Sequence, residues 1–259
     1  VTLLEGPFKR AQDLNLEHLL QYDVDRLLAP FRKEAGLAPK AEPFPNWSGL
    51  DGHVGGHYLT AMALYVASIG NAQCQQRMEY IVQELAACQV ANGNGYVGGI
   101  PNGHRIWTQL GQGNIRPLHR AWVPWYNLHK TFAGLRDAWI HGKNAQAKQV
   151  LIKLADWCDA LLRDFADEQM ETMLNQEHGG MNEVLADISR STGDKTYLDL
   201  ACRFSHRQLL DPMSKGRDSL DNKHANTQVP KAVGFQRIAE LGGDDKHLKA
   251  AQFYGGTVL

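Results

Sequence analysis

The sequence lacks the features that mark several large classes of protein. Its 28 acidic residues nearly cancel its 27 Lys and Arg, the formal net charge is -1, and no basic run stands out. This balance argues against a nucleic-acid-binding surface. No hydrophobic stretch is long enough to span a membrane, and the composition does not suggest disorder. We therefore expect no nucleic-acid partner and no membrane partner.

Cysteine is scarce too. The four cysteines are far apart and form no C-x-x-C pair: Cys74, Cys88, Cys158 and Cys202. They are typical of small core residues on helices and specify neither a disulfide framework nor a metal site. An initiating Met and a charged-then-apolar leader are also missing, so the chain is either processed or expressed as a segment. We expect a periplasmic or secreted protein after signal removal, with a cytoplasmic one as the alternative.

Runs of β-branched residues are few, whereas Ala, Leu and Gln fill most segments, which predicts mainly helix. The clearest helix is predicted over residues 123–142, with Pro124 in its first turn and Gly142 as its terminal cap. Its apolar residues recur at steps of three and four and share one face: Trp125, Leu128, Phe132, Leu135 and Trp139. Other helices are expected at about 11–28, 56–69, 72–91, 143–165 and from about 246.

A helix, a turn with Gly and a polar residue, and a second helix recur along the chain. The turns lie at Gly70, Gly142, Gly193 and Gly243, with gaps of 72, 51 and 50 residues, and residues 92–121 form an insertion in the first gap. One helix pair cannot bury its own apolar face, so such repeats indicate stacked or toroidal helix hairpins. The sequence predicts an all-α helix-hairpin toroid, a partial barrel, as one domain over residues 1–259. The last helix has no visible stop, so we expect this domain to be incomplete at its C-terminus.

A histidine stands near the start of the first helix of each pair: His57, His129, His178 and His224. In a toroid these helix starts point toward one end, so the four histidines are candidates for lining one pocket. The alternative for each is a hydrogen-bonded histidine of the core.

Two irregular segments add candidate residues. The segment from Pro30 to Gly56 is rich in Pro, Gly and charge, and it places Trp47, Asp51 and His53 at the mouth of the next helix. The insertion interleaves tryptophans with cations, which suits a sugar platform or, equally, tryptophans packed beneath a loop: Trp107, Trp122, Trp125, Arg105, Arg116, His119 and Arg120. Its glycine-rich start lacks the G-K-[ST] of a phosphate loop.

Several long motifs resemble one family. They are G-P-F-K-R-A-Q-D-L-N, D-V-D-R-L-L-A-P-F-R-K-E-A-G-L, G-L-D-G-H-V-G-G-H-Y-L, V-P-W-Y-N-L-H-K-T-F-A-G-L, E-H-G-G-M-N-E and H-A-N-T-Q-V-P-K. Over nearly all its length, the sequence is similar to the N-terminal part of bacterial β-L-arabinofuranosidases of glycoside hydrolase families 127 and 146. The resemblance implies an (α/α)6 barrel, here partial, and a retaining exo-acting glycosidase of carbohydrate metabolism that acts on arabinose-containing plant cell-wall glycans.

The resemblance also implies a zinc-bound cysteine nucleophile with a glutamate as acid/base. The family's E-x-C and C-C-P-P-N motifs, which hold these groups, do not occur in this sequence. The catalytic residues are therefore unknown, no zinc ligand set is expected in this chain, and the chain alone is expected to be inactive. By resemblance, His129, His178 and His224 bind the sugar, with Asp51, His53 and His57 as further candidates.

Other functions remain open at this point. A carboxylate pair such as Asp51 with Glu177 or Glu183 would suit an ordinary glycosidase. A toroid of this kind also suits a sugar epimerase or a polysaccharide lyase, or a non-catalytic carbohydrate-binding module. An open barrel would expose an apolar edge, so a homodimer is a further expectation.

Overall fold

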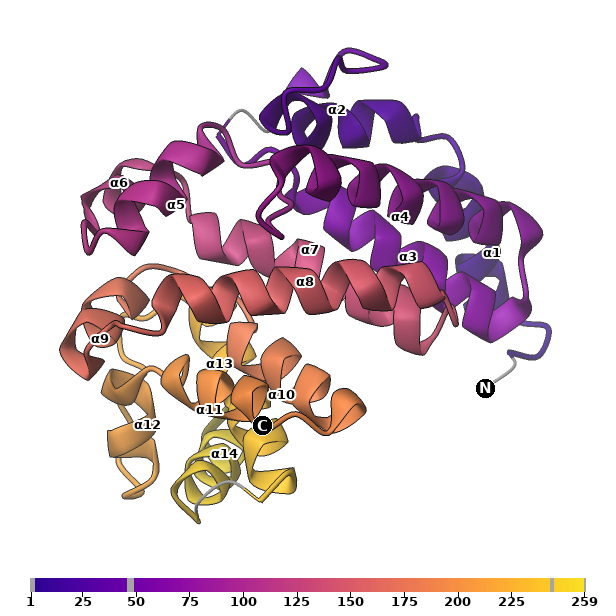
Figure 1. The fold of residues 1–259 in the computed structure, drawn as a ribbon. Coiled ribbons are helices and arrows are strands. Elements are labelled where there is room, and N and C mark those ends of the chain that lie inside the picture. Colours follow the sequence, from indigo (N-terminus) through magenta and orange to yellow (C-terminus); the bar gives the residue numbers. More distant parts are fainter. Residues whose placement is uncertain (1–2, 46–48, 243–244, 259) are drawn as a thin grey trace. The chain divides into compact units, whose positions relative to one another are not determined.

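The computed structural model describes residues 3–45, 49–242 and 245–258, and within them the regular elements are helices without any strand (Figure 1). None of these helices has the length and apolar character needed to cross a bilayer. By their contacts, the residues form two compact units: unit 1 comprises residues 1–101 and 130–154, and unit 2 comprises residues 102–129 and 155–259. The prediction of a single domain incomplete at its C-terminus stays a prediction.

Unit 1 is built on the packing of three helices against one another. It contains α1 (Pro7–Leu19), α2 (Val24–Glu34), α3 (His53–Ile69) and α4 (Ala72–Asn92), together with parts of α7 (Pro124–Ile140) and α8 (Ala145–Leu162). Helices α2, α3 and α4 contact one another. Large apolar side chains from these helices fill the core: Leu28, Phe31, Leu59, Met62, Met78 and Val82.

The expected helix over residues 11–28 is wrong, because the chain breaks into α1 and α2. Asp23 causes the break: it has extended backbone, and its side chain accepts a hydrogen bond from the Asp25 N–H at 2.9 Å, so it caps a new helix. Helix α2 then continues through Pro30 as far as Glu34. The irregular segment therefore begins after Glu34, later than expected.

Two glycines let α3 and α7 approach backbone to backbone inside unit 1. A Cβ on Gly56 would lie 2.2 Å from the Lys130 carbonyl oxygen, and one on Gly134 would lie 2.6 Å from the Gly56 carbonyl oxygen. Any larger residue would collide with these carbonyls. This contact explains why the motifs G-G-H-Y and F-A-G-L carry glycine on otherwise apolar helices.

Helix α7 has the predicted apolar stripe. Trp125, Leu128, Phe132 and Leu135 are buried, while Trp139 at its end is partly exposed beneath the Lys148 ammonium, 5.0 Å from the ring centroid. Helix α7 ends at Ile140, and the expected stop at Gly142 lies in the turn that follows, where Lys143 has a positive φ of 56°. Gly142 is needed for space, because a Cβ there would lie 2.2 Å from Met78 Sδ.

Unit 2 contains the remaining helices. These are α5 (Gly103–Gly111), α6 (Arg116–Arg120), α9 (Asp167–Leu174), α10 (Met181–Thr192), α11 (Thr196–Arg203), α12 (Arg207–Met213), α13 (Ala225–Glu240) and α14 (Asp245–Val258). Helix α10 packs on α11 and α13, and α14 packs on α12 and α13. Much of the insertion at residues 92–121, expected to be loop, is helical in α5 and α6.

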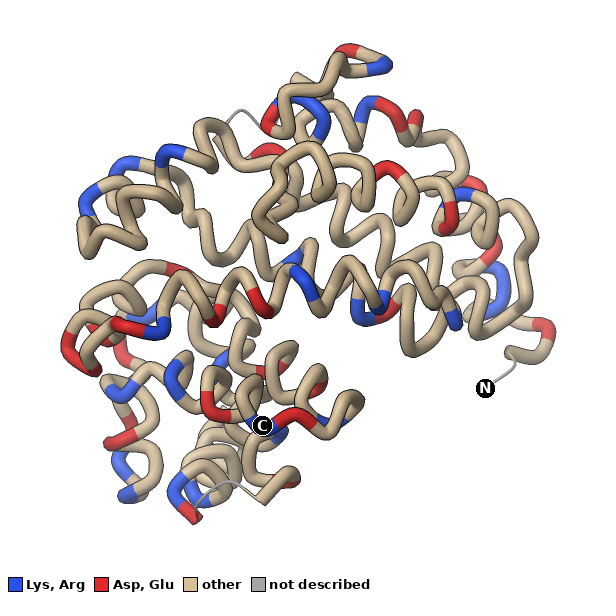
Figure 2. The backbone as a smooth tube through the Cα atoms, in the orientation of Figure 1, with Lys and Arg blue, Asp and Glu red and all other residues tan. Residues whose placement is uncertain are grey.

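The repeat turns are confirmed at three of their four positions, since residues 141–142 form the turn between α7, which ends at Ile140, and α8, which begins at Ala145. Gly70 ends α3 and Gly193 ends α10, each with a left-handed backbone at φ of 65° and 80°. The turn at Gly243 lies outside the described residues. Charges of both signs are scattered along most of the helices, whereas α5 and α6 carry basic residues alone (Figure 2).

Candidate functional site

The ring of His129 is held by the glycines of the E-H-G-G-M-N-E motif. His129 lies on α7, and its Nδ1 accepts a hydrogen bond from the Gly180 N–H at 3.1 Å. A Cβ on Gly179 would lie 2.6 Å from His129 Nδ1, and one on Gly180 would lie 3.0 Å from Nε2. Only glycine lets this loop lie against the ring. Because Nδ1 accepts, the proton of the neutral imidazole is on Nε2, which is a donor.

His178 has the opposite tautomer. Its Nδ1 lies 3.2 Å from the Gln176 carbonyl oxygen, which can only accept, so Nδ1 carries the proton. Burial, and next the nearby Lys231 cation, hold the pKa of His178 well below its usual value, so the ring is neutral and Nε2 is an acceptor. This Nε2 is buried and has no hydrogen-bond partner among the described residues. His178 is 0% exposed, so it has the features of a core histidine as well as an unsatisfied acceptor.

The start of α13 lies beside the same loop. His224 is the N-cap residue: its Nδ1 accepts from the Asn226 N–H at 3.2 Å, and its side chain is exposed. The Asn226 amide donates to Glu177 Oε1 at 3.0 Å and also hydrogen-bonds with the Tyr126 hydroxyl. Tyr126 thus joins the start of α7 to the other two motifs.

Unit 2 therefore brings together three motifs that are far apart in the sequence. Residues of Y-N-L-H, E-H-G-G-M and H-A-N-T contact one another through the pairs His129–Gly180, Asn226–Glu177 and Tyr126–Asn226. The convergence of helix starts that the repeats predicted is present for these three. That all four histidines line one pocket stays a prediction, because His57 belongs to unit 1.

Beside these motifs lies a buried cation that sequence reasoning missed. Lys231 on α13 is 1% exposed, and its Nζ lies 2.9 Å from His206 Nδ1 and 3.2 Å from Gln228 Oε1. Desolvation, and next the charge of Lys223, lower the pKa of Lys231 to about 8, while burial and Lys231 lower that of His206 to about 3. His206 is therefore neutral, and its Nε2–H faces Asn175 Oδ1 at 3.3 Å.

The position of Lys231 in the sequence held one clue. It follows Gln228 by three residues, so both lie on the same face of α13 as the buried Ala232 and Phe235. A lysine on an apolar stripe is unusual. Its partner His206 comes from the turn between α11 and α12, and no pattern in the sequence connects the two.

The other three candidates lie in unit 1. Asp51 and His53 line a common pocket, with the Asp51 carboxylate accepting from the Gly49 N–H at 2.7 Å. His53 is buried, with Nδ1 2.6 Å from the Leu50 carbonyl oxygen, and desolvation lowers its pKa. His57 is exposed on α3, with its ring 6.2 Å from that of His53. Trp47 lies outside the described residues.

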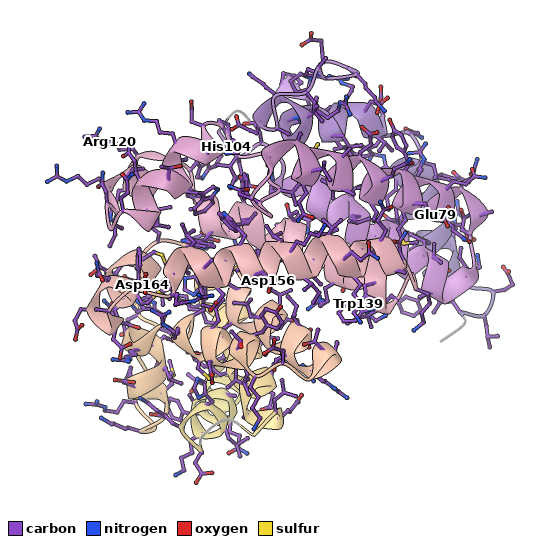
Figure 3. The ribbon with its side chains drawn as sticks, viewed as in Figure 1. Glu79, His104, Arg120, Trp139, Asp156 and Asp164 are labelled. Atoms are coloured by element: carbon purple, nitrogen blue, oxygen red, sulfur yellow. The ribbon has the colours of Figure 1, made fainter. Side chains whose placement is uncertain are left out.

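The tryptophans of the insertion belong mainly to the core of unit 2. Trp107 and Trp125 are buried with ring centroids 4.7 Å apart, and Trp107 also contacts Trp157. Trp122 is 53% exposed. Arg120 extends outward from the end of α6 (Figure 3). The alternative of tryptophans packed under a loop thus fits Trp107 and Trp125 better than the sugar platform.

The four cysteines do not fit a zinc-thiolate centre. Cys74, Cys88 and Cys158 are buried and free, and Cys202 is partly exposed. Desolvation raises the pKa of the first three thiols, that of Cys88 to about 11. No group of three or more His, Cys, Asp or Glu side chains able to hold a metal ion occurs among the residues described.

A family model described as β-L-arabinofuranosidase, GH127 catalytic domain, matches residues 1–258. Among solved structures, the chain is similar to that of Ara127N-Se, a GH127 β-L-arabinofuranosidase from Geobacillus stearothermophilus T6, with a TM-score of 0.62 and 14% identity. The similarity covers 98% of this chain but only 44% of that chain. This likeness confirms the predicted all-α helix-hairpin toroid as the fold class. No curated protein matches the chain.

Proposed function

Because the chain belongs to the family of GH127 β-L-arabinofuranosidase catalytic domains, we propose that it is the sugar-binding part of a glycoside hydrolase. The substrate would be a glycan with terminal β-L-arabinofuranosyl residues, as in plant cell walls, and the reaction an exo-acting cleavage with retention in bacterial carbohydrate metabolism. The single observation that carries the proposal is the meeting of three motifs within unit 2. His224 also caps α13, but that role does not require the Asn226 side chain to reach Glu177 of the second motif.

The histidine tautomers suit a polyhydroxylated ligand. A neutral sugar hydroxyl both donates and accepts, so it is recognised best by fixed donors and acceptors together. His129 offers Nε2–H as a donor and His178 offers Nε2 as an acceptor, each fixed by a backbone hydrogen bond to its Nδ1. His224 also accepts at Nδ1 and therefore has an Nε2–H donor. These residues bind and orient the sugar in our proposal; they do not cleave the bond.

The expectation of zinc rests only on the resemblance to the family. When bound, zinc would lower the pKa of a cysteine thiol and supply a thiolate nucleophile. Because burial raises the pKa of Cys74, Cys88 and Cys158, these thiols do not fit that role, and we derive no step through them. We propose that the zinc ligands and the acid/base glutamate come from other residues of the enzyme.

The proposal is tested by measuring the binding of methyl β-L-arabinofuranoside to the protein by calorimetry. His129→Ala, His178→Ala and His224→Ala should each raise the Kd by about tenfold, since each loses a hydrogen bond of about 1 kcal/mol or more. His141→Ala is the matched control, because His141 is exposed in the turn after α7. Unaltered helical circular dichroism would show that the variants are folded.

The outcomes separate the histidines from one another. Wild-type affinity in all three variants would show that the unit 2 cluster does not bind the sugar. His178 gives the sharpest result because its ring is fully buried: an unchanged Kd with a lowered urea midpoint would identify it as a core residue only. Binding without hydrolysis of aryl β-L-arabinofuranosides by the complete protein would favour a carbohydrate-binding module.

A further inference from the structure

All three Asn-Gly pairs of the sequence lie between the end of α4 and the start of α5. They are Asn92–Gly93, Asn94–Gly95 and Asn102–Gly103. An asparagine before glycine loses its side-chain amide readily, because the glycine nitrogen can attack the side-chain carbon and no Cβ obstructs its approach. The attack also requires that this nitrogen is not engaged in a hydrogen bond and that the main chain can move. The structure separates the three pairs by these requirements.

Asn94 and Gly95 meet both requirements. They lie in the irregular segment after α4, where Asn94 is exposed and Gly95 has a φ of 89°. Within the described part of the chain, the Gly95 N–H donates no hydrogen bond. The Asn94 side-chain oxygen accepts from the Tyr96 N–H at 3.0 Å. The ring closed by this bond includes the Gly95 nitrogen and the carbon that it attacks, so the two atoms stay near each other.

The hydrogen bond from Tyr96 also assists the reaction. When the Gly95 nitrogen adds to the side-chain carbon of Asn94, negative charge gathers on the side-chain oxygen. The Tyr96 N–H already donates to this oxygen, so a donor is in place where the charge develops. Residue 94 therefore combines an exposed side chain, an available nucleophile and a preformed donor.

The pair at the end of α4 is protected by its hydrogen bonds. The Gly93 N–H caps the helix by donating to the Gln89 carbonyl oxygen at 3.2 Å, so this nitrogen is engaged. The Asn92 side-chain amide donates to the Tyr96 carbonyl oxygen at 2.8 Å. Both bonds would have to break before the Gly93 nitrogen could reach the side-chain carbon of Asn92.

The third pair is protected by the first turn of α5. Gly103 is buried and begins the helix, and Asn102 is its N-cap residue with a left-handed φ of 58°. The Asn102 carbonyl oxygen accepts from the Ile106 N–H at 3.1 Å. The main chain of this pair thus belongs to the helix and cannot turn without opening it.

We propose that Asn94 is a site of spontaneous deamidation and isoaspartate formation in the folded protein. The Gly95 nitrogen bonds to Asn94 Cγ, the Cγ–Nδ2 bond breaks, and the proton of the Gly95 nitrogen passes through water to the amide, which leaves as ammonia. The product is a succinimide ring. Water then opens the ring: addition at Cγ gives aspartate, and addition at the main-chain carbonyl carbon gives isoaspartate, whose peptide link runs through Cγ.

Isoaspartate lengthens the main chain by one methylene group at a point where unit 1 holds it tightly. The Gly95 carbonyl oxygen accepts from Gln89 Nε2 at 2.7 Å, and the same amide donates to the Val150 carbonyl oxygen at 2.9 Å. Residues 96–100, which follow directly, are all buried. The longer link therefore displaces this hydrogen bond or the buried segment, whereas aspartate preserves the main chain. IsoAsp at position 94 should lower the stability of unit 1.

The test follows each asparagine separately within one peptide. Trypsin releases residues 78–105 in one piece, and the asparagines of this peptide are Asn92, Asn94 and Asn102. The folded protein is incubated in H₂¹⁸O at mildly alkaline pH, and fragmentation in the mass spectrometer locates the oxygen that water supplies. Asn94 should gain ¹⁸O about tenfold faster than the other two, because their hydrogen bonds must open first.

Two samples serve as controls for the effect of sequence alone. In urea the hydrogen bonds are lost, so the three asparagines should react at similar rates. Asn94→Gln should gain little ¹⁸O at position 94, because its longer side chain would have to close a six-membered ring. Equal rates at the three asparagines of the folded protein, or a faster rate at Asn92 or Asn102, would overturn the proposal.

The effect on unit 1 is measured on protein that has been aged in the same way. A methyltransferase specific for isoaspartate should label this protein in proportion to the ¹⁸O found at Asn94. The labelled fraction should unfold at a lower urea concentration than Asn94→Asp, which has the normal main chain. Equal midpoints would overturn the packing argument. Neither measurement involves sugar binding, so the outcome is independent of the proposed function.

Discussion

Replacing Lys231 by Met removes a buried cation that makes no salt bridge to a carboxylate of the described residues, and its effect on stability should depend on pH. Among the described residues, the hydrogen-bond partners of Lys231 Nζ are the neutral acceptors His206 and Gln228, and burial lowers the pKa to about 8 from the usual 10.5. Burying this charge costs free energy that no ion pair returns.

The sign of the pH dependence follows from which state holds the proton. Between about pH 8 and 10.5 the unfolded chain keeps the lysine proton while the folded chain releases it, so the unfolded state binds more protons. The free energy of unfolding of the wild type should therefore rise with pH in this window. The lowering of the pKa from 10.5 to about 8 corresponds to a total rise of about 3 kcal/mol.

The assay is urea unfolding at several pH values from 7 to 10.5. Tryptophan fluorescence is a suitable signal, because Trp107, Trp122, Trp125 and Trp157 lie in unit 2 with Lys231. The free energy of unfolding of the wild type minus that of Lys231→Met should increase by about 3 kcal/mol across the window, since other titrations cancel in the difference. Lys215→Met, at an exposed lysine, should give a constant difference. If the free energy of unfolding changed with pH in the same way for the wild type and Lys231→Met, the reasoning would be refuted.

Three further predictions concern glycines and cysteines. Gly179→Ala should weaken sugar binding by about tenfold, because its Cβ would push the His129 ring aside, whereas Gly193→Ala, with a similar positive φ and open space around it, should only lower stability. Gly234→Ala should lower the free energy of unfolding by about 1–3 kcal/mol or more, because its Cβ would lie 2.1 Å from the buried Asn182 side chain; Gly255→Ala, in open space, serves as its control in urea unfolding. In the native protein at pH 7.5, a thiol reagent should modify Cys202 first and leave Cys88 and Cys158 unmodified until urea is added, and equal rates would contradict the burial argument.

The sequence predicted the long helices well because their information is local. The stripe of α7 and the turns at Gly70 and Gly193 depend on spacing and on backbone conformations that neighbouring residues determine. The signal for the break before α2 is also local, since Asp23 is a good N-cap residue. The leucines before and after Asp23 have the spacing of one continuous helix, so the break was not predicted. Helix α5 was missed because its Gly-rich flanks resemble a loop.

The candidate site was predicted only in part, since its contacts are tertiary. Histidines near repeated helix starts pointed to His178 and His224, and their neighbours Glu177 and Asn226 do meet. The Lys231–His206 pair could not be foreseen, because it depends on how the α11–α12 turn packs on α13. The requirement for glycine at Gly142 likewise comes from a methionine far away in the chain.

The backbone contact between α3 and α7 also limits how this protein can be engineered. At Gly56 and Gly134 the neighbouring atoms are main-chain carbonyls, which cannot change rotamer to make room. A library that randomises either position should return glycine alone among folded clones, whereas exposed positions on the same helices, such as Leu64, should accept many residue types. Attempts to improve thermostability by replacing helical glycines with alanine should therefore begin at Gly255 and Gly256, where space is open, and leave this pair untouched.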